Sequence, residues 1–205
     1  MLMSILILTH ERPALFKRCL ESVLNILPKN IEIIVNNDSN DIKEIQHKQV
    51  KYFYKQSKNL SDIYSFLLKQ SKGEYIYYLE DDDYLHNDFF NNLFDIIIKY
   101  DLICGNYYPT YKPDFFIKAI KQFSLNKPFC IDKELMQLGQ FIFKRNLIID
   151  FDFPNDSHIH NDYKLVQHSL SKHPKILTLS KVFYFQTTDG GDNISFPEST
   201  NYYGY

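Results

Sequence analysis

The sequence lacks the features that mark several common classes of protein. It holds 23 Lys and Arg against 25 Asp and Glu, and this absence of positive excess argues against a nucleic-acid partner. Its three cysteines (Cys19, Cys104 and Cys130) are far apart and form no CxxC pair, as expected in a reducing compartment rather than in a disulfide framework or zinc knuckle. No uncharged apolar run is long enough to span a bilayer, and residues 1–8 carry no basic leader. We therefore expect a soluble protein whose first residues form a buried strand.

What the sequence does contain is an alternation of strand-like and helix-like segments within 205 residues, a length that suits one domain. Apolar runs predict strands at 4–8, 31–35, 50–54, 75–79 and 102–108. Helical spacing predicts helices at 13–27, 61–72 and 87–100, the first opening on Pro13 and the second capped by Ser61. Weaker patterns predict helices at 114–123 and 160–171, and extended segments at 140–144 and 176–185. This order predicts an α/β fold with a mostly parallel sheet and helices on both faces.

Polar clusters follow three of the predicted strands. They are Thr9-His10-Glu11, Asn36 to Asp38, and Glu80 to Asp83. Ligands of such sheets bind beyond the carboxyl ends of the strands, so we expect these three clusters to converge on one crevice.

The run Glu80-Asp81-Asp82-Asp83 is the strongest single signal. Four adjacent carboxylates repel one another, which favours binding of a proton or a cation. Carboxylate oxygens suit Mg²⁺ or Mn²⁺, which take one or two carboxylates together with substrate phosphates. The simpler alternative is a solvated acidic turn at the start of the next helix.

Three segments resemble, in order and spacing, the family 2 inverting glycosyltransferases of the GT-A fold. They are residues 5–13, residues 34–41 and residues 73–85, and the likeness returns at 138–145 and 160–163. The resemblance implies one GT-A domain over 1–205. Residues 1–110 would form its nucleotide-sugar-binding half and residues 111–205 its acceptor-binding and catalytic half.

The resemblance also implies roles for individual residues. The donor-binding set is Thr9, His10, Glu11, Arg12, Asn36, Asn37, Asp38, Asn59, Glu80 and Asp81. Glu80 would approach the donor ribose, while Asp82 and Asp83 would hold a divalent cation, Mn²⁺ or Mg²⁺. Asp162 would be the general base, with helix capping as the alternative, and Gly139 and Gln140 would lie on the acceptor side, with a plain core strand as the alternative.

Two departures from the family pattern bear on the donor. Asn36-Asn37-Asp38-Ser39 stands where the family commonly has two aspartates, the second of which reads uracil; an asparagine amide can still pair with a pyrimidine edge. The polar turn from Asp189 to Asn193 resembles the loop that folds over the donor, but it lacks the metal-binding histidine of many members. Asp189 or a water would take that role, or the segment is only a turn.

The implied activity is metal-assisted, inverting transfer of a sugar from a nucleotide donor, UDP-sugar favoured, to a glycan or glycolipid hydroxyl. A Lys-, Asn-, Ile- and Tyr-rich composition suggests a microbial enzyme of surface-polysaccharide or lipooligosaccharide assembly, cytoplasmic and possibly peripheral to the inner face of the membrane. The alternatives are a nucleotide- or glycan-binding module with reduced chemistry and, more distantly, a metallohydrolase using His158 and His160. A nucleotidyltransferase is disfavoured because no glycine-rich loop follows the first strand.

Overall fold

The computed structural model describes residues 1–39, 43–57, 59–109, 137–154 and 161–187. The strands are β1 (Met3–Thr9), β2 (Ile31–Asn37), β3 (Val50–Phe53), β4 (Tyr75–Glu80), β5 (Tyr84–Leu85), β6 (Leu102–Pro109), β7 (Phe141–Lys144) and β8 (Ile176–Gln186). The helices are α1 (Pro13–Leu24), α2 (Leu60–Gln70), α3 (Leu93–Ile97) and α5 (Asn161–Ser171), with short 3-10 turns η1 (Leu138–Gln140) and η2 (Arg145–Leu147). In the described ranges, no helix is both long enough and apolar enough to cross a bilayer.

The strands form one 8-stranded sheet in the order β3-β2-β1-β4-β7-β6-β8-β5. The first four pair in parallel, whereas β7 is antiparallel to both of its neighbours, β4 and β6. β8 runs parallel to β6, and β5 pairs with it antiparallel at the edge. β1 lies between β2 and β4, in the middle of the parallel part of the sheet. It is buried along its whole length and apolar from Ile5 to Leu8, as expected for a central parallel strand.

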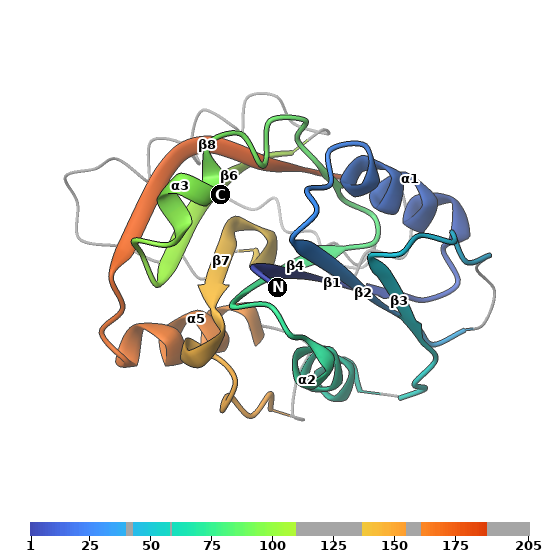
Figure 1. Ribbon diagram of the computed structural model, residues 1–205. Helices are drawn as coiled ribbons and strands as arrows, with labels where there is room; N and C mark the ends of the chain where they lie inside the picture. The colour runs from blue at the N-terminus through green and yellow to red at the C-terminus, as the bar shows by residue number, and fades with distance from the viewer. Residues whose placement is uncertain (40–42, 58, 110–136, 155–160, 188–205) are drawn as a thin grey trace, which may run out of the picture.

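Helices cover both faces of the sheet (Figure 1). On one face α1 and α3 enclose a core cluster around Phe16, Leu20 and Phe89. On the other face α2 and α5 enclose a second cluster around Leu67 and Leu165. The sheet thus separates two apolar layers, and its carboxyl edge is left for polar side chains.

The predicted α/β sheet with helices on both faces is confirmed, and most predicted elements lie within a few residues of the observed ones. The long helix expected over 87–100 is wrong. That range contains turns and only the short α3, because Asn92 adopts a left-handed conformation (φ 57°) that interrupts a helix before Leu93. Phe89 and Phe90 are both buried in those turns, which supplied the misleading apolar pattern.

Two predicted helix boundaries also need correction. Ser61 does not cap α2: Asn59 is the N-cap, and its side chain accepts a hydrogen bond of 2.9 Å from the Ser61 backbone N–H. The Ser61 hydroxyl instead donates to the carbonyl of Pro154 at 2.7 Å. Helix α1 ends at Leu24 rather than at residue 27.

Candidate active site

The register of the parallel strands brings the three polar clusters together. Thr9 of β1 pairs with Asn37 of β2, and Leu8 pairs with both Asn36 of β2 and Glu80 of β4. The predicted convergence of the strand ends at one edge of the sheet is therefore confirmed. β7 runs antiparallel to β4, so the residues just before it, Gly139 and Gln140, lie toward the same edge.

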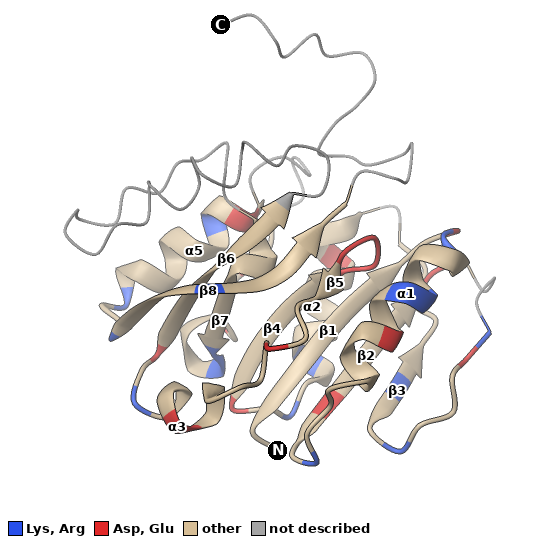
Figure 2. Cartoon of the chain, turned by 90° about the horizontal axis from the view of Figure 1, so that it is seen from above, with Lys and Arg blue, Asp and Glu red and all other residues tan. Residues whose placement is uncertain are grey.

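The acidic run forms a tight turn between β4 and β5, visible as a red loop beside β5 in Figure 2. Asp81, Asp82 and Asp83 are buried, with residual exposures of 0%, 6% and 5%, and Glu80 is partly buried. The Asp83 backbone N–H donates to the Glu80 carbonyl at 3.1 Å, which closes the turn. This is not the solvated acidic turn that the simpler alternative described.

Burial, reinforced by the charges of neighbouring carboxylates, raises the pKa values of three carboxyl groups in this run: Glu80, Asp81 and Asp83. Burial raises the pKa of Glu80 to about 8, opposed by a 2.7 Å hydrogen bond from the Tyr64 hydroxyl and reinforced by the charges of Asp82 and Asp162. Burial raises the pKa of Asp81 to about 7 and that of Asp83 well above its ordinary range. Positive charge close to the run favours the ionised form of these groups.

Two arginines of the α1 region supply positive charge to this turn. Arg12 donates from Nη1 to Asp82 Oδ2 at 3.2 Å and from Nη2 to Asp81 Oδ1. Arg18 donates from Nη2 to the Asp82 carbonyl oxygen and, at 2.8 Å, to the Thr187 hydroxyl. Thr187 in turn donates its backbone N–H to Asp83 Oδ1 at 3.0 Å, so the end of β8 is fastened to the acidic turn.

The polar side chains at the end of β2 have two kinds of surroundings: some bond to neighbouring backbone, and one keeps a donor that is unbonded among the described residues. Asn36 holds the chain after β3, because its amide exchanges hydrogen bonds of 2.9 and 3.0 Å with the backbone of Lys55. Asn37 Oδ1 accepts from the Ser39 backbone at 3.1 Å and from the Ser39 hydroxyl at 2.9 Å. Its buried Nδ2 has no hydrogen-bond partner in the part of the chain that the structure describes. Asp38 lies 2.6 Å from Nδ1 of His10. Asn37 is thus the asparagine with an amide donor left for a ligand.

Asp162, in the first turn of α5, is partly buried against η1. Its Oδ2 accepts a 3.0 Å hydrogen bond from the Leu138 backbone N–H. Burial raises the pKa of Asp162 to about 6, partly offset by this bond and by its own backbone N–H. The neighbouring Asn161 donates to the Ser61 hydroxyl at 3.0 Å, so the start of α5 is fixed to α2. A carboxylate with a pKa near 6 is suited to accept a proton at neutral pH.

The sheet edge beyond Asp162 holds several buried amides. The Gly139 carbonyl accepts from the Tyr77 hydroxyl at 2.8 Å, and an added Cβ at Gly139 would lie 2.8 Å from the Tyr184 ring, so only glycine fits. Gln140 Oε1 accepts from the Gln137 backbone at 3.0 Å. Gln140 Nε2 and Asn106 Oδ1 are buried without a partner among the described residues. A polar ligand could satisfy both atoms.

The residues at this edge fit a divalent cation that is shared with a ligand rather than held by protein alone. Oδ2 of buried Asp81 has no hydrogen-bond partner in the described ranges, and Asp82 and Asp83 supply further hard oxygens. No three His, Cys, Asp or Glu side chains there are arranged to hold a metal by themselves. Mg²⁺ and Mn²⁺ typically take one or two carboxylates and complete their shell with phosphate oxygens and water.

Sequence analysis missed several residues that shape this site. Arg18, Tyr64, Asn106 and Thr187 all touch or adjoin the acidic turn or the sheet edge, although α1 and α2 gave no signal beyond ordinary helix periodicity. Four predicted features lie outside the described residues: the loop from Asp189 to Asn193, the helix at 114–123, and the candidate metallohydrolase ligands His158 and His160.

Asn59, predicted to bind the donor, is observed as the N-cap of α2, and the two roles give different mutational results. Replacing Asn59 by alanine should lower the free energy of unfolding by about 1 kcal/mol, because the Ser61 N–H loses its acceptor. Asn59→Asp keeps that acceptor and should restore stability in chemical denaturation. If Asn59→Asp nevertheless weakens nucleotide binding, the donor role stands; unchanged binding in both variants would leave only the cap.

The sequence of the chain matches a known protein family and several known proteins. The sequence model described as "Glycosyl transferase family 2" matches residues 4–173. Glycosyltransferase GlyA of Streptococcus pneumoniae is 29% identical over 103 residues, which cover 45% of this chain and 15% of that protein. An uncharacterized glycosyltransferase of Rickettsia bellii is 32% identical over 104 residues, 47% of this chain and 14% of that protein. The chain thus spans less than a fifth of the length of these two curated relatives.

Solved structures share the fold at low sequence identity. The crystal structure of S. aureus TarS 1–349 in complex with UDP-GlcNAc superposes with a TM-score of 0.73 at 18% identity, covering 94% of this chain and 60% of that one. The mannosyltransferase PcManGT from Pyrobaculum calidifontis, in complex with GDP-Man and Mn²⁺, gives a TM-score of 0.63 at 12% identity, covering 90% and 56%. The expected GT-A type of sheet is confirmed.

Proposed function

Because the chain belongs to glycosyl transferase family 2, we propose that it moves a sugar from a nucleotide-diphosphate donor to an acceptor hydroxyl with inversion. The observation that carries this proposal is the position of Asp162. It is a partly buried carboxylate with a raised pKa, and its charge contributes to the raised pKa of Glu80 at the end of β4. Metal-assisted displacement by a hydroxyl needs a base that accepts the hydroxyl proton and, close to it, a site for the metal ion that stabilises the leaving group.

The nucleotide would lie over the ends of β1 and β2. Buried Asn37 has an Nδ2 donor without a described partner, and that donor suits a carbonyl oxygen on a pyrimidine. The pair of exposed His10 and partly buried Asp38 would flank it, and Glu80 would face the ribose. These contacts favour a UDP-sugar, the kind of donor present in the TarS complex.

A divalent cation, when bound, would neutralise the leaving diphosphate. Asp82 and Asp83 would hold it at the turn between β4 and β5, with the diphosphate completing its shell. Arg18 and the Thr187 hydroxyl hold that turn in place, because both donate hydrogen bonds to the backbone carbonyl of Asp82.

Asp162 would remove the proton of the acceptor hydroxyl as its oxygen attacks the anomeric carbon. The Leu138 N–H bond holds the Asp162 carboxylate in place through Oδ2, and the carboxylate would present its other oxygen to the acceptor. Gly139 and Gln140 would line the acceptor side next to it, and Asn106 adds a buried amide oxygen at the same edge. Residues 1–110 would then form the donor half and residues 111–205 the acceptor half.

The acceptor we propose is a glycan or glycolipid of a microbial surface, handled by a cytoplasmic enzyme at or near the inner face of the membrane. Release of nucleoside diphosphate from UDP-, GDP- and dTDP-sugars tests the transferase proposal, with polysaccharide extracts as acceptors. We expect release that rises with both Mn²⁺ and acceptor. A protein that binds the nucleotide sugars but never releases diphosphate would be a binding module instead.

The raised pKa of Asp162 predicts the pH dependence of the reaction. A general base works only when it is deprotonated, so kcat/KM should fall by roughly tenfold per pH unit below the pKa. Because burial raises that pKa to about 6, the plot of kcat/KM against pH should begin to fall near pH 6 rather than near pH 4 as the pH is lowered. Initial rates from pH 4.5 to 8, checked for unfolding by circular dichroism, measure it. A limb that bends near pH 4 would assign the base to an exposed carboxylate.

A further inference from the structure

The Arg12 guanidinium bridges two carboxylates of the acidic turn. Its Nη1 donates to Asp82 Oδ2 at 3.2 Å and its Nη2 to Asp81 Oδ1. The Arg12 side chain is 21% exposed, whereas those of Asp81 and Asp82 are 0% and 9% exposed. Arg12 therefore places a positive charge among the oxygens that would hold a divalent cation.

The backbone before Arg12 is built to keep it there. Glu11 has a φ of 49°, a left-handed conformation that is unfavourable for a residue with a Cβ and persists only where surroundings enforce it. The Glu11 N–H donates to the Ser39 hydroxyl at 2.9 Å, and Ser39 is itself held by Asn37. Pro13 then starts α1 immediately after Arg12. The position of Arg12 is thus fixed by the segment that follows β2 and by the start of α1.

From this geometry we infer that Arg12 is a resident counter-cation. It pairs with the Asp82 carboxylate in the donor-free protein, and this pair breaks when a divalent cation binds Asp82 together with the donor diphosphate. The inference rests on the proposed function. A carboxylate oxygen cannot serve a guanidinium and a metal ion equally, and two cations a few ångströms apart repel each other. The diphosphate removes both obstacles, because it brings negative charge and offers the guanidinium a new bidentate partner.

It follows that the metal ion and the nucleotide bind cooperatively. Mn²⁺ alone must displace Arg12 and binds weakly, whereas Mn²⁺ with a nucleoside diphosphate binds more tightly. By linkage, each ligand strengthens the binding of the other by the same factor. Arg18 does not take this role, since its bond to Asp82 goes to the backbone carbonyl and not to the carboxylate.

Titration of Mn²⁺ alone, followed by the electron paramagnetic resonance of the free ion, tests the inference. Arg12→Gln removes the competing charge and should tighten Mn²⁺ binding in the absence of nucleotide by about tenfold or more. The gain in Mn²⁺ affinity that saturating UDP produces in the wild type should shrink by the same factor. Arg12→Lys keeps the charge without the two-pronged contact and should lie between the two proteins.

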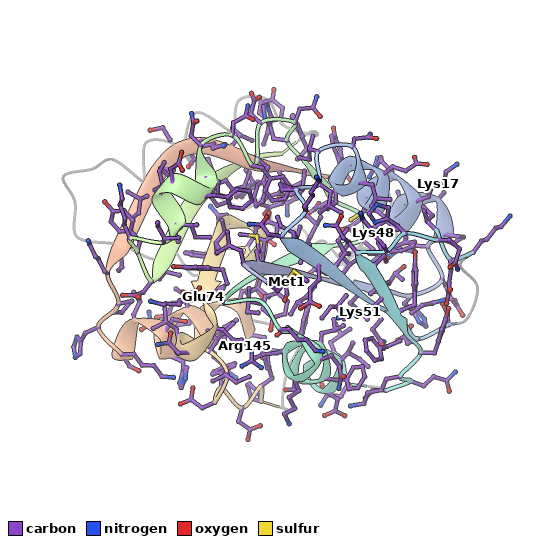
Figure 3. All side chains as sticks on the ribbon, in the orientation of Figure 1. Met1, Lys17, Lys48, Lys51, Glu74 and Arg145 are labelled. Atoms are coloured by element: carbon purple, nitrogen blue, oxygen red, sulfur yellow. The ribbon has the colours of Figure 1, made fainter. Side chains whose placement is uncertain are left out.

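Lys17→Gln is the matched control. Lys17 is a 67% exposed cation of α1, the helix that Arg12 precedes; it pairs with Glu21 and points away from the sheet (Figure 3). Its loss should leave Mn²⁺ affinity unchanged. The inference is overturned if Arg12→Gln and Arg12→Lys bind Mn²⁺ no more tightly than the wild type, or if Lys17→Gln has an equal effect. Neither result bears on sugar transfer, which is measured separately by diphosphate release.

Discussion

Asp162→Asn should lower kcat by about 10²- to 10⁴-fold, the usual contribution of a positioned general base, and should leave donor affinity unchanged. Asparagine keeps an oxygen that can accept from the Leu138 N–H, now 3.0 Å from Asp162 Oδ2, so the contact between α5 and η1 survives. It cannot accept the proton of the acceptor hydroxyl. Turnover by diphosphate release and nucleotide affinity by calorimetry, measured on the same preparation, separate the two effects.

Asp162→Ala provides the control for structure. It removes the acceptor as well as the base, so it should lower both kcat and the melting temperature, whereas Asp162→Asn should lower kcat alone. The opposite pattern would assign Asp162 to holding the start of α5. In that case Asp162→Asn would retain near-native turnover and Asp162→Ala would lose about 1 kcal/mol of stability, as expected for a helix-end contact.

Asp82→Asn should weaken Mn²⁺-supported binding of UDP by at least about 100-fold, because loss of even an outer-sphere partner of a metal ion costs about 10- to 100-fold. An amide oxygen is a poorer ligand than a carboxylate for a hard cation. The neighbouring Asp81 cannot simply replace Asp82, because Asp81 is already paired with Arg12. A chelator should reduce UDP binding of the wild type to a similar extent. Calorimetric titration of UDP with Mn²⁺ and with chelator measures both.

Asp88→Asn is the control for simple loss of charge. Asp88 lies a few residues further along the chain, and its side chain is 62% exposed. This variant should bind UDP and Mn²⁺ like the wild type. The metal assignment is wrong if chelator leaves UDP affinity unchanged, or if Asp88→Asn and Asp82→Asn weaken binding equally.

Much of this site could be predicted because it depends on strand order. An apolar run that leads directly into Glu80 to Asp83 marks both a central strand and its polar end, and the carboxyl ends of parallel strands must meet. The same reasoning predicts that Thr9 and Asn37 lie close together, and the two residues are paired in neighbouring strands. The role of Asp162 is implied by the resemblance alone, since no local pattern shows that the start of α5 contacts η1 and α2.

The parts that escaped prediction depend on contacts between residues distant in sequence. The partners Arg12 and Asp81 are 69 residues apart, and Arg18 and Thr187 are 169 apart. Nothing near Arg18 distinguishes it from any charged residue on a helix surface. Asn36 and Asn37 look equivalent in the sequence, yet the Asn36 amide is bonded to the Lys55 backbone, whereas Asn37 Nδ2 has no partner among the described residues. The failed helix over 87–100 has a local cause, the left-handed Asn92, which the apolar pattern conceals.

A thermal-shift screen with UDP-, GDP- and dTDP-sugars, each with Mn²⁺ and with chelator, tests the central claim most directly. A ligand present at 100 times its Kd stabilises the folded state by about 2.7 kcal/mol, which is readily seen as a higher melting temperature. The account predicts that at least one class of donor, UDP-sugars first, raises the melting temperature of the wild type with Mn²⁺ but not with chelator, and fails to do so in Asp82→Asn. A shift that is the same with chelator, or that Asp82→Asn retains in full, would contradict it.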